Sequence, residues 1–138
     1  MNMRDRIRDK IIEIETFLEE LESVLPSNFE EYRQDFKVRS IGERYFEKII
    51  EAVVDLSFFL INERKLRQPE HEKESFDILE ENGIISKELS SKLSDAKGMR
   101  NIIAHEYGKI DDELVFHSLT KELIPDVQEF IKQISNLK

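Results

Sequence analysis

Apolar residues recur every three or four positions along most of the chain, which is the period of an α-helix. The first such stretch covers residues 7–25, and the segment Pro26-Ser27-Asn28 ends it and offers a cap for the next helix. The second covers residues 29–60, and its part from 49 to 61 is apolar on more than one face. We therefore predict two long helices, the second at the centre of a bundle and loosened or bent at Gly42.

The rest of the chain continues the helical period in shorter segments. Residues 63–73 are polar and contain Pro69, so we predict a loop there, followed by a short helix over 74–81 that stops at Asn82-Gly83. Ser86 is placed to cap a helix whose apolar positions run from 89 to 103. Gly108 is expected to end that helix.

A last helix is predicted over residues 116–137, capped by Asp111 or Asp112 and kinked where Pro125 interrupts it. With only 4 Gly and 3 Pro, the chain lacks the turns that a β-sandwich or barrel requires. The 138 residues suit a single domain, residues 1–138. The predicted fold is all-α, an antiparallel bundle of four to five helices.

Composition narrows the possible functions. The chain has no cysteine, which removes disulfides, thiolate nucleophiles and cysteine-based zinc sites. No apolar run approaches the ~18 residues of a membrane span, so we expect a cytoplasmic protein that does not engage membranes. The net charge of −9 argues against a broad nucleic-acid-binding surface, though it leaves room for a small basic site.

The chain has three histidines, of which His71 and His117 are expected to be solvated or structural. His105 stands in the stretch Arg100-Asn101-Ile102-Ile103-Ala104-His105-Glu106-Tyr107-Gly108, near the predicted end of a helix. The negative end of the helix dipole favours the imidazolium form of a histidine placed there. Histidine is the side chain that ordinarily changes charge near neutral pH, so it can both accept and donate a proton.

Helical geometry constrains how these residues can meet. At about 100° per residue, Asn101 and His105 lie about 40° apart on one face, whereas Arg100 and His105 are about 140° apart. Arg100 and His105 can reach one substrate if the helix end unwinds, or if two chains each contribute. The alternative is structural, with Arg100 and His105 stabilising the helix end and Tyr107 packing beside the last helix, since Arg-x4-His is by itself a loose pattern.

The string Arg100-Asn101-x3-His105-x-Tyr107 resembles the R-x4-H-x-Y motif of the HepT-like ribonuclease toxins, which belong to the HEPN superfamily. The resemblance extends to the long central segment with Arg44 and residues 50–55, and to residues 76–85 before the motif helix. It covers most of residues 5–137.

This resemblance implies a helical homodimer whose motifs face one another across a cleft, with metal-independent endoribonuclease activity and no cofactor. It implies that His105 is the acid–base group, that Arg100 binds the phosphate and transition state, and that Asn101 orients His105 or the phosphate. It further implies a type VII-like toxin–antitoxin pair, in which a nucleotidyltransferase antitoxin can adenylylate Tyr107. RNA is then the substrate, and a 2′,3′-cyclic phosphate is the usual product.

Other interpretations stay open. The chain could instead be a non-catalytic HEPN module that binds a nucleotide or a partner protein, or a scaffold for a nucleotidyltransferase. Glu51 and Asp55, one turn apart on the central helix, could be buried partners of Arg44 or Lys48, or could line the cleft near Arg100. Tyr107 could pack against the last helix and never be modified.

Overall fold

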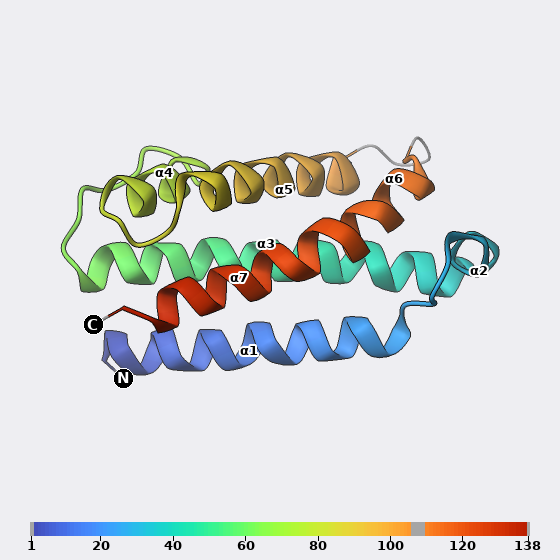
Figure 1. The fold of residues 1–138 in the computed structure, drawn as a ribbon, viewed down its shortest axis with the longest axis horizontal. Coiled ribbons are helices and arrows are strands. Elements are labelled where there is room, and N and C mark those ends of the chain that lie inside the picture. Colours follow the sequence, from blue (N-terminus) through green and yellow to red (C-terminus); the bar gives the residue numbers. More distant parts are fainter. Residues whose placement is uncertain (1, 106–109, 138) are drawn as a thin grey trace.

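The computed structural model describes residues 2–105 and 110–137, and these form a bundle of helices without strands. Figure 1 shows α1 and α3 lying antiparallel along the long axis, α5 on the other side of α3, and the last helical segment crossing obliquely over them. The prediction of an all-α antiparallel bundle is confirmed. The helices, in chain order, are α1 (Met3–Val24), α2 (Phe29–Gln34), α3 (Phe36–Glu63), α4 (Glu74–Glu81), α5 (Lys87–His105), α6 (Asp112–His117), the π-helical segment η1 (Ser118–Leu123) and α7 (Ile124–Ser135).

Helix α3 is the centre of the hydrophobic core, as its two-sided apolar pattern predicted. Ile49, Ile50, Val53 and Leu56 on α3 are completely shielded from solvent at 0% exposure. Helix α1 packs along the length of α3, and α5 and α4 cover its other side. The core therefore surrounds α3 and fixes the position of α5.

The predicted single helix over residues 29–60 is wrong, because the chain breaks at Asp35 into α2 and α3. The Asp35 carboxylate accepts hydrogen bonds from the backbone N–H groups of Lys37 and Val38 at 3.0 and 3.3 Å. This capping replaces the intrahelical bonds that a new helix start lacks. The apolar period continues across the break and therefore conceals it.

Gly42 lies inside α3, where it permits a close approach between helices rather than a break. A Cβ atom at this position would stand 3.0 Å from Leu119 Cδ1 and 3.2 Å from Tyr32 Oη. Tyr32 of α2 is fully buried, and the centroid of its ring lies 5.0 Å from that of Phe116 of α6. Burial raises the pKa of the Tyr32 hydroxyl well above its usual range.

The predicted boundaries in the middle of the chain are confirmed. Helix α4 covers the predicted residues 74–81, and Gly83 adopts the positive φ of 71° that a glycine after a helix end accommodates. The Ser86 hydroxyl accepts a hydrogen bond from the Leu89 N–H at 3.1 Å at the start of α5. The Asp111 carboxylate caps α6, while the predicted stop at Gly108 lies outside the described residues.

The irregularity predicted at Pro125 takes the form of the π-helical segment η1, which ends just before it. Proline has no N–H, and its ring crowds the carbonyl one turn earlier in an α-helix. The Ile124 N–H bonds to the Leu119 carbonyl, five residues back, so the helix widens there.

Among the described residues, no helix is both long enough and apolar enough to cross a membrane.

Candidate active site on helix α5

Helix α5 carries Arg100, Asn101 and His105 in its last two turns. The helix remains regular through His105, so it does not unwind between Arg100 and the histidine. Asn101 and His105 are exposed, and Arg100 is half-buried. Because the helix stays intact, the separation of about 140° around its axis between Arg100 and His105 persists within one chain.

The guanidinium of Arg100 is anchored on two sides. Its Nη2 donates to Glu51 Oε1 of α3 at 2.7 Å, and its Nη1 donates to Asn101 Oδ1 at 3.4 Å. Its Nε lies away from solvent and has no acceptor among the described residues. The short charge-assisted bond to Glu51 fixes the direction of the Arg100 side chain.

For Glu51 the structure selects the alternative near Arg100, whereas for Asp55 it shows a partner that was not among the alternatives. Glu51 pairs with Arg100 and so belongs beside the motif. Asp55, one turn further along α3, pairs instead with Lys10 of α1 at 3.6 Å. The pairing with Arg44 or Lys48 is wrong for both, since Arg44 contacts Glu47 and the Lys48 ammonium lies over two aromatic rings.

Lys97 is a neighbour of the motif that the sequence analysis missed. Only 8% of its surface is exposed, and its Nζ lies 3.4 Å from Asn101 Oδ1. The same Nζ is 3.4 Å from Glu72 Oε2, which lies just before α4. The spacing of four residues between Lys97 and Asn101 is the signal that could have revealed this neighbour, because such residues meet on a helix surface.

The other singled-out residues lie apart from this group. His71 and His117 are exposed, as expected. Tyr107, the expected site of modification, lies outside the described residues. Among residues 2–105 and 110–137, no cluster of three or more histidine, aspartate or glutamate side chains has the arrangement to hold a metal ion.

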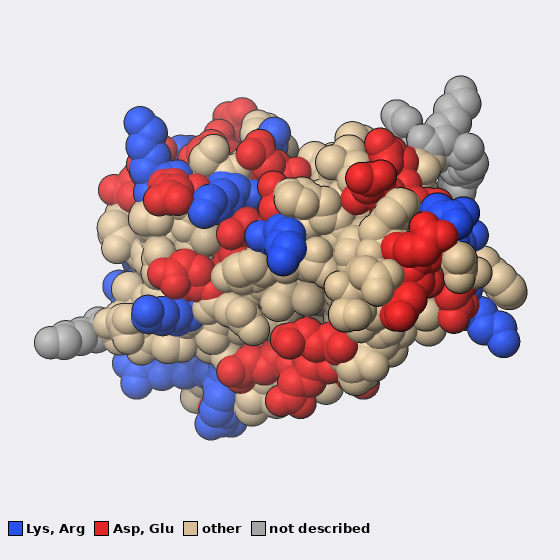
Figure 2. All heavy atoms as spheres, turned by 45° about the vertical axis from the view of Figure 1, so that its right-hand side comes forward, with Lys and Arg blue, Asp and Glu red and all other residues tan. Residues whose placement is uncertain are grey.

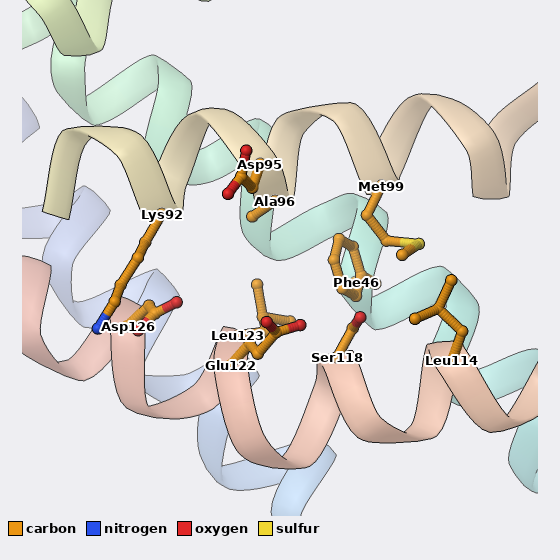
Figure 3. A pocket seen from close by; sticks show the side chains of 10 residues that line it. All are labelled: Phe46, Lys92, Asp95, Ala96, Met99, Leu114, Ser118, Glu122, Leu123 and Asp126. Carbon is orange, nitrogen blue, oxygen red and sulfur yellow. The ribbon is translucent and has the colours of Figure 1, made fainter. Parts of the chain in front are cut away.

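A cavity of about 150 Å³ lies on the opposite side of α5. In Figure 3 side chains from α5 face those of the α6–η1–α7 segment across it, with Phe46 of α3 behind. At about 100° per residue, the α5 residues that line the cavity point away from Lys97, Asn101 and His105. The cavity is thus separate from the candidate site; its lining residues are Phe46, Lys92, Asp95, Ala96, Met99, Leu114, Ser118, Glu122, Leu123 and Asp126.

The distribution of charge agrees with a local rather than an extended basic site. Figure 2 shows one face on which basic side chains lie in small groups between acidic and uncharged ones. Beside the motif, Lys97 and Arg100 bring two positive charges together, and each has a carboxylate partner. Of the two, Arg100 is the more accessible cation, because Lys97 is buried.

An all-helical bundle with Arg-Asn-x3-His on the last turns of a partly exposed helix has the fold and motif of the HEPN class of ribonucleases. Residues 14–134 match the family described as Ribonuclease HepT-like. The chain belongs to this family, which confirms the identification made from the sequence.

Two curated relatives align over most of their length. The chain is 27% identical over 132 residues to the mRNA nuclease HepT of Shewanella oneidensis, covering 96% of this chain and 98% of the relative. It is 25% identical over 120 residues to the tRNA nuclease HepT of Aphanizomenon flos-aquae, covering 87% of this chain and 81% of the relative. The two relatives are named for different classes of RNA.

Solved structures show the same fold. The tri-AMPylated HEPN toxin of Shewanella oneidensis, in complex with MNT antitoxin, superimposes with a TM-score of 0.88 at 26% identity and covers 99% of this chain and 100% of that one. A toxin–antitoxin crystal structure with AMP-PNP also gives a TM-score of 0.88, at 25% identity, and covers 96% of this chain and 99% of that one.

Proposed function

We propose that this chain is a metal-independent endoribonuclease toxin that cleaves RNA with Arg100, Asn101 and His105. Membership of the HepT-like family supports the activity. The observation that carries the assignment of the site is the anchoring of Arg100 by Glu51 and Asn101, on a helix whose last turn also exposes His105. A fixed guanidinium is suited to stabilise the negative charge on the phosphoryl oxygens in the transition state.

The reaction follows from the chemistry of these groups. A neutral His105 accepts the proton of a ribose 2′-OH, and the 2′-oxygen attacks the adjacent phosphorus. The bond to the 5′-oxygen of the next nucleotide breaks, and that oxygen receives a proton from a histidine in its imidazolium form. The products are a 2′,3′-cyclic phosphate and a 5′-hydroxyl.

We further propose that the site is completed by a second copy of the chain. One helix directs Arg100 and His105 about 140° apart, and α5 is intact through His105, so a facing copy is the arrangement that brings a histidine from each chain to one phosphate. Two-fold pairs are the commonest closed assemblies. The homodimer would thereby supply an acid, a base and two arginines.

We also propose that a nucleotidyltransferase antitoxin is the partner and that Tyr107 is the residue it modifies. The similar Shewanella toxin is both tri-AMPylated and bound to MNT antitoxin, which supports this assignment. An AMP group on Tyr107, two residues beyond His105, would place negative phosphate beside the site and repel RNA.

We also propose that residues 1–138 form one domain and that the protein acts in the cytoplasm.

Alanine variants test the assignment of the site. His105→Ala is expected to abolish cleavage of a defined RNA, and Arg100→Ala to lower it by about 100-fold or more, with unchanged circular dichroism. His117→Ala is the matched control, because His117 is also an exposed histidine on a helix but lies outside the motif. Cleavage by His105→Ala at the wild-type rate would show that the site lies elsewhere.

A further inference from the structure

Three polar side chains follow one another along a single face of α5. Lys97, Asn101 and His105 are spaced by four residues, so each lies about one turn beyond the previous one. Asn101 and His105 are exposed, whereas Lys97 is buried. A buried lysine requires partners, and one of its two partners is Asn101 itself.

Asn101 receives hydrogen bonds from two cations at the same atom. Lys97 Nζ and Arg100 Nη1 each lie 3.4 Å from Asn101 Oδ1. Ammonium and guanidinium groups only donate hydrogen bonds, so the amide must turn its oxygen toward them. The Asn101 NH₂ group is consequently directed away from both cations.

The free end of the amide has no acceptor in this chain as described. Nothing within residues 2–105 or 110–137 accepts a hydrogen bond from Asn101 Nδ2, although the side chain is exposed. An exposed amide with a fixed oxygen presents two N–H donors in a defined direction. Such donors suit a phosphoryl oxygen, on the face of the helix that also carries His105.

We propose that Lys97 is a positioning residue of the ribonuclease site, which holds Asn101 Oδ1 so that Asn101 Nδ2 donates to the RNA phosphate. This inference rests on the proposed function. Lys97 acts through Asn101, since its own ammonium is buried between Asn101 and Glu72. Loss of Lys97 removes one of two restraints and lets the amide rotate, so the phosphate loses an oriented donor.

The test compares Lys97→Met with Lys97→Arg. Methionine keeps the unbranched shape without a donor, and kcat for RNA is expected to fall about tenfold or more, as for small misplacements in other sites. Arginine retains donors and is expected to restore most of kcat. Lys92→Met is the matched control, because Lys92 lies on the opposite face of α5 and pairs with an exposed Glu88 at 3.1 Å.

A double variant separates positioning from a general structural role. In an Asn101→Ala background, Lys97→Met is expected to cause little further loss, because the group it positions is gone. Asn101→Asp is expected to lose as much activity as Asn101→Ala, since aspartate still meets both cations but has no donor. Full activity of Lys97→Met, or an equal loss in both backgrounds, would overturn the inference.

A measurement on the unaltered protein covers the case in which Lys97→Met fails to fold. Binding of a non-cleavable 2′-O-methyl RNA is expected to shift the Asn101 side-chain amide resonance, and an unmoved resonance in the saturated complex would contradict the inference.

The failure of the proposed function can be told apart from the failure of this inference. Cleavage that survives in His105→Ala overturns the site as a whole. Cleavage lost in His105→Ala but retained in Lys97→Met overturns only the role of Lys97.

Discussion

The ion pair between Glu51 and Arg100 allows a quantitative prediction about how the arginine is held. The two side chains meet at 2.7 Å and are 47% and 23% exposed, respectively. A pair this exposed contributes about 1 kcal/mol or less to folding, so Glu51→Ala should change the free energy of unfolding only slightly. Its main effect is expected on the orientation of Arg100.

The expected kinetic effect follows from the mobility that the arginine regains. An arginine side chain carries about 2 kcal/mol of rotamer entropy, and a loss of that size in the transition state would be about 30-fold in rate. In Glu51→Ala, Asn101 still contacts Nη1 of Arg100, so the arginine side chain regains only part of its rotamer freedom. We therefore expect kcat/KM of Glu51→Ala to fall about tenfold, within that limit.

The assay is cleavage of a fluorescent RNA by protein purified without an antitoxin, with thermal unfolding measured in parallel. Asp55→Ala is the matched control, because Asp55 lies one turn away on α3, is 55% exposed, and pairs with Lys10 rather than the motif. An increased rate in Glu51→Ala would show that the carboxylate competes with phosphate for Arg100. That result, an unchanged rate, or an equal loss in Asp55→Ala would refute the reasoning.

Three further predictions concern assembly, control and packing. Light scattering at micromolar concentration is expected to give the mass of a dimer, and a monomer alone would remove the two-chain site. Co-expression with a nucleotidyltransferase antitoxin is expected to raise the intact mass in whole AMP steps that Tyr107→Phe abolishes; neutralised toxicity with an unmodified mass would remove the role of Tyr107. Gly42→Ala is expected to lower the melting temperature, since overpacking against buried Leu119 costs about 1–3 kcal/mol and exceeds the gain in helix propensity of up to about 1 kcal/mol. Gly98→Ala, whose added Cβ meets nothing within 4 Å, should instead raise it, and the opposite order of the two variants would contradict the packing argument.

Much of the fold could be predicted because local signals determine it. The apolar period, together with the cap at Ser86 and the stop at Gly83, placed most helices near their observed bounds. The break at Asp35 was missed because apolar residues continue at helical spacing through Tyr32 and Phe36. A capping carboxylate inside a periodic stretch is indistinguishable, in sequence, from a solvated one.

The residues of the candidate site also differ in whether local sequence signals could predict them. Arg100, Asn101 and His105 form a sequence motif, and Lys97 follows the same local rule at a spacing of four residues. Glu51 could be placed only as one of several alternatives, because it lies 49 residues from Arg100 and meets it through the packing of α5 on α3. Sequence spacing describes one helix, whereas this contact depends on how two helices are set against each other.

The central claim is that histidine and arginine side chains cleave RNA by attack of the 2′-hydroxyl, without a metal ion. Its most direct test is to identify the ends of RNA fragments produced by the wild-type protein in the presence of EDTA. The account predicts 2′,3′-cyclic phosphate and 5′-hydroxyl ends, with none formed by His105→Ala. Fragments with 3′-hydroxyl and 5′-phosphate ends, or cleavage that EDTA abolishes, would contradict it.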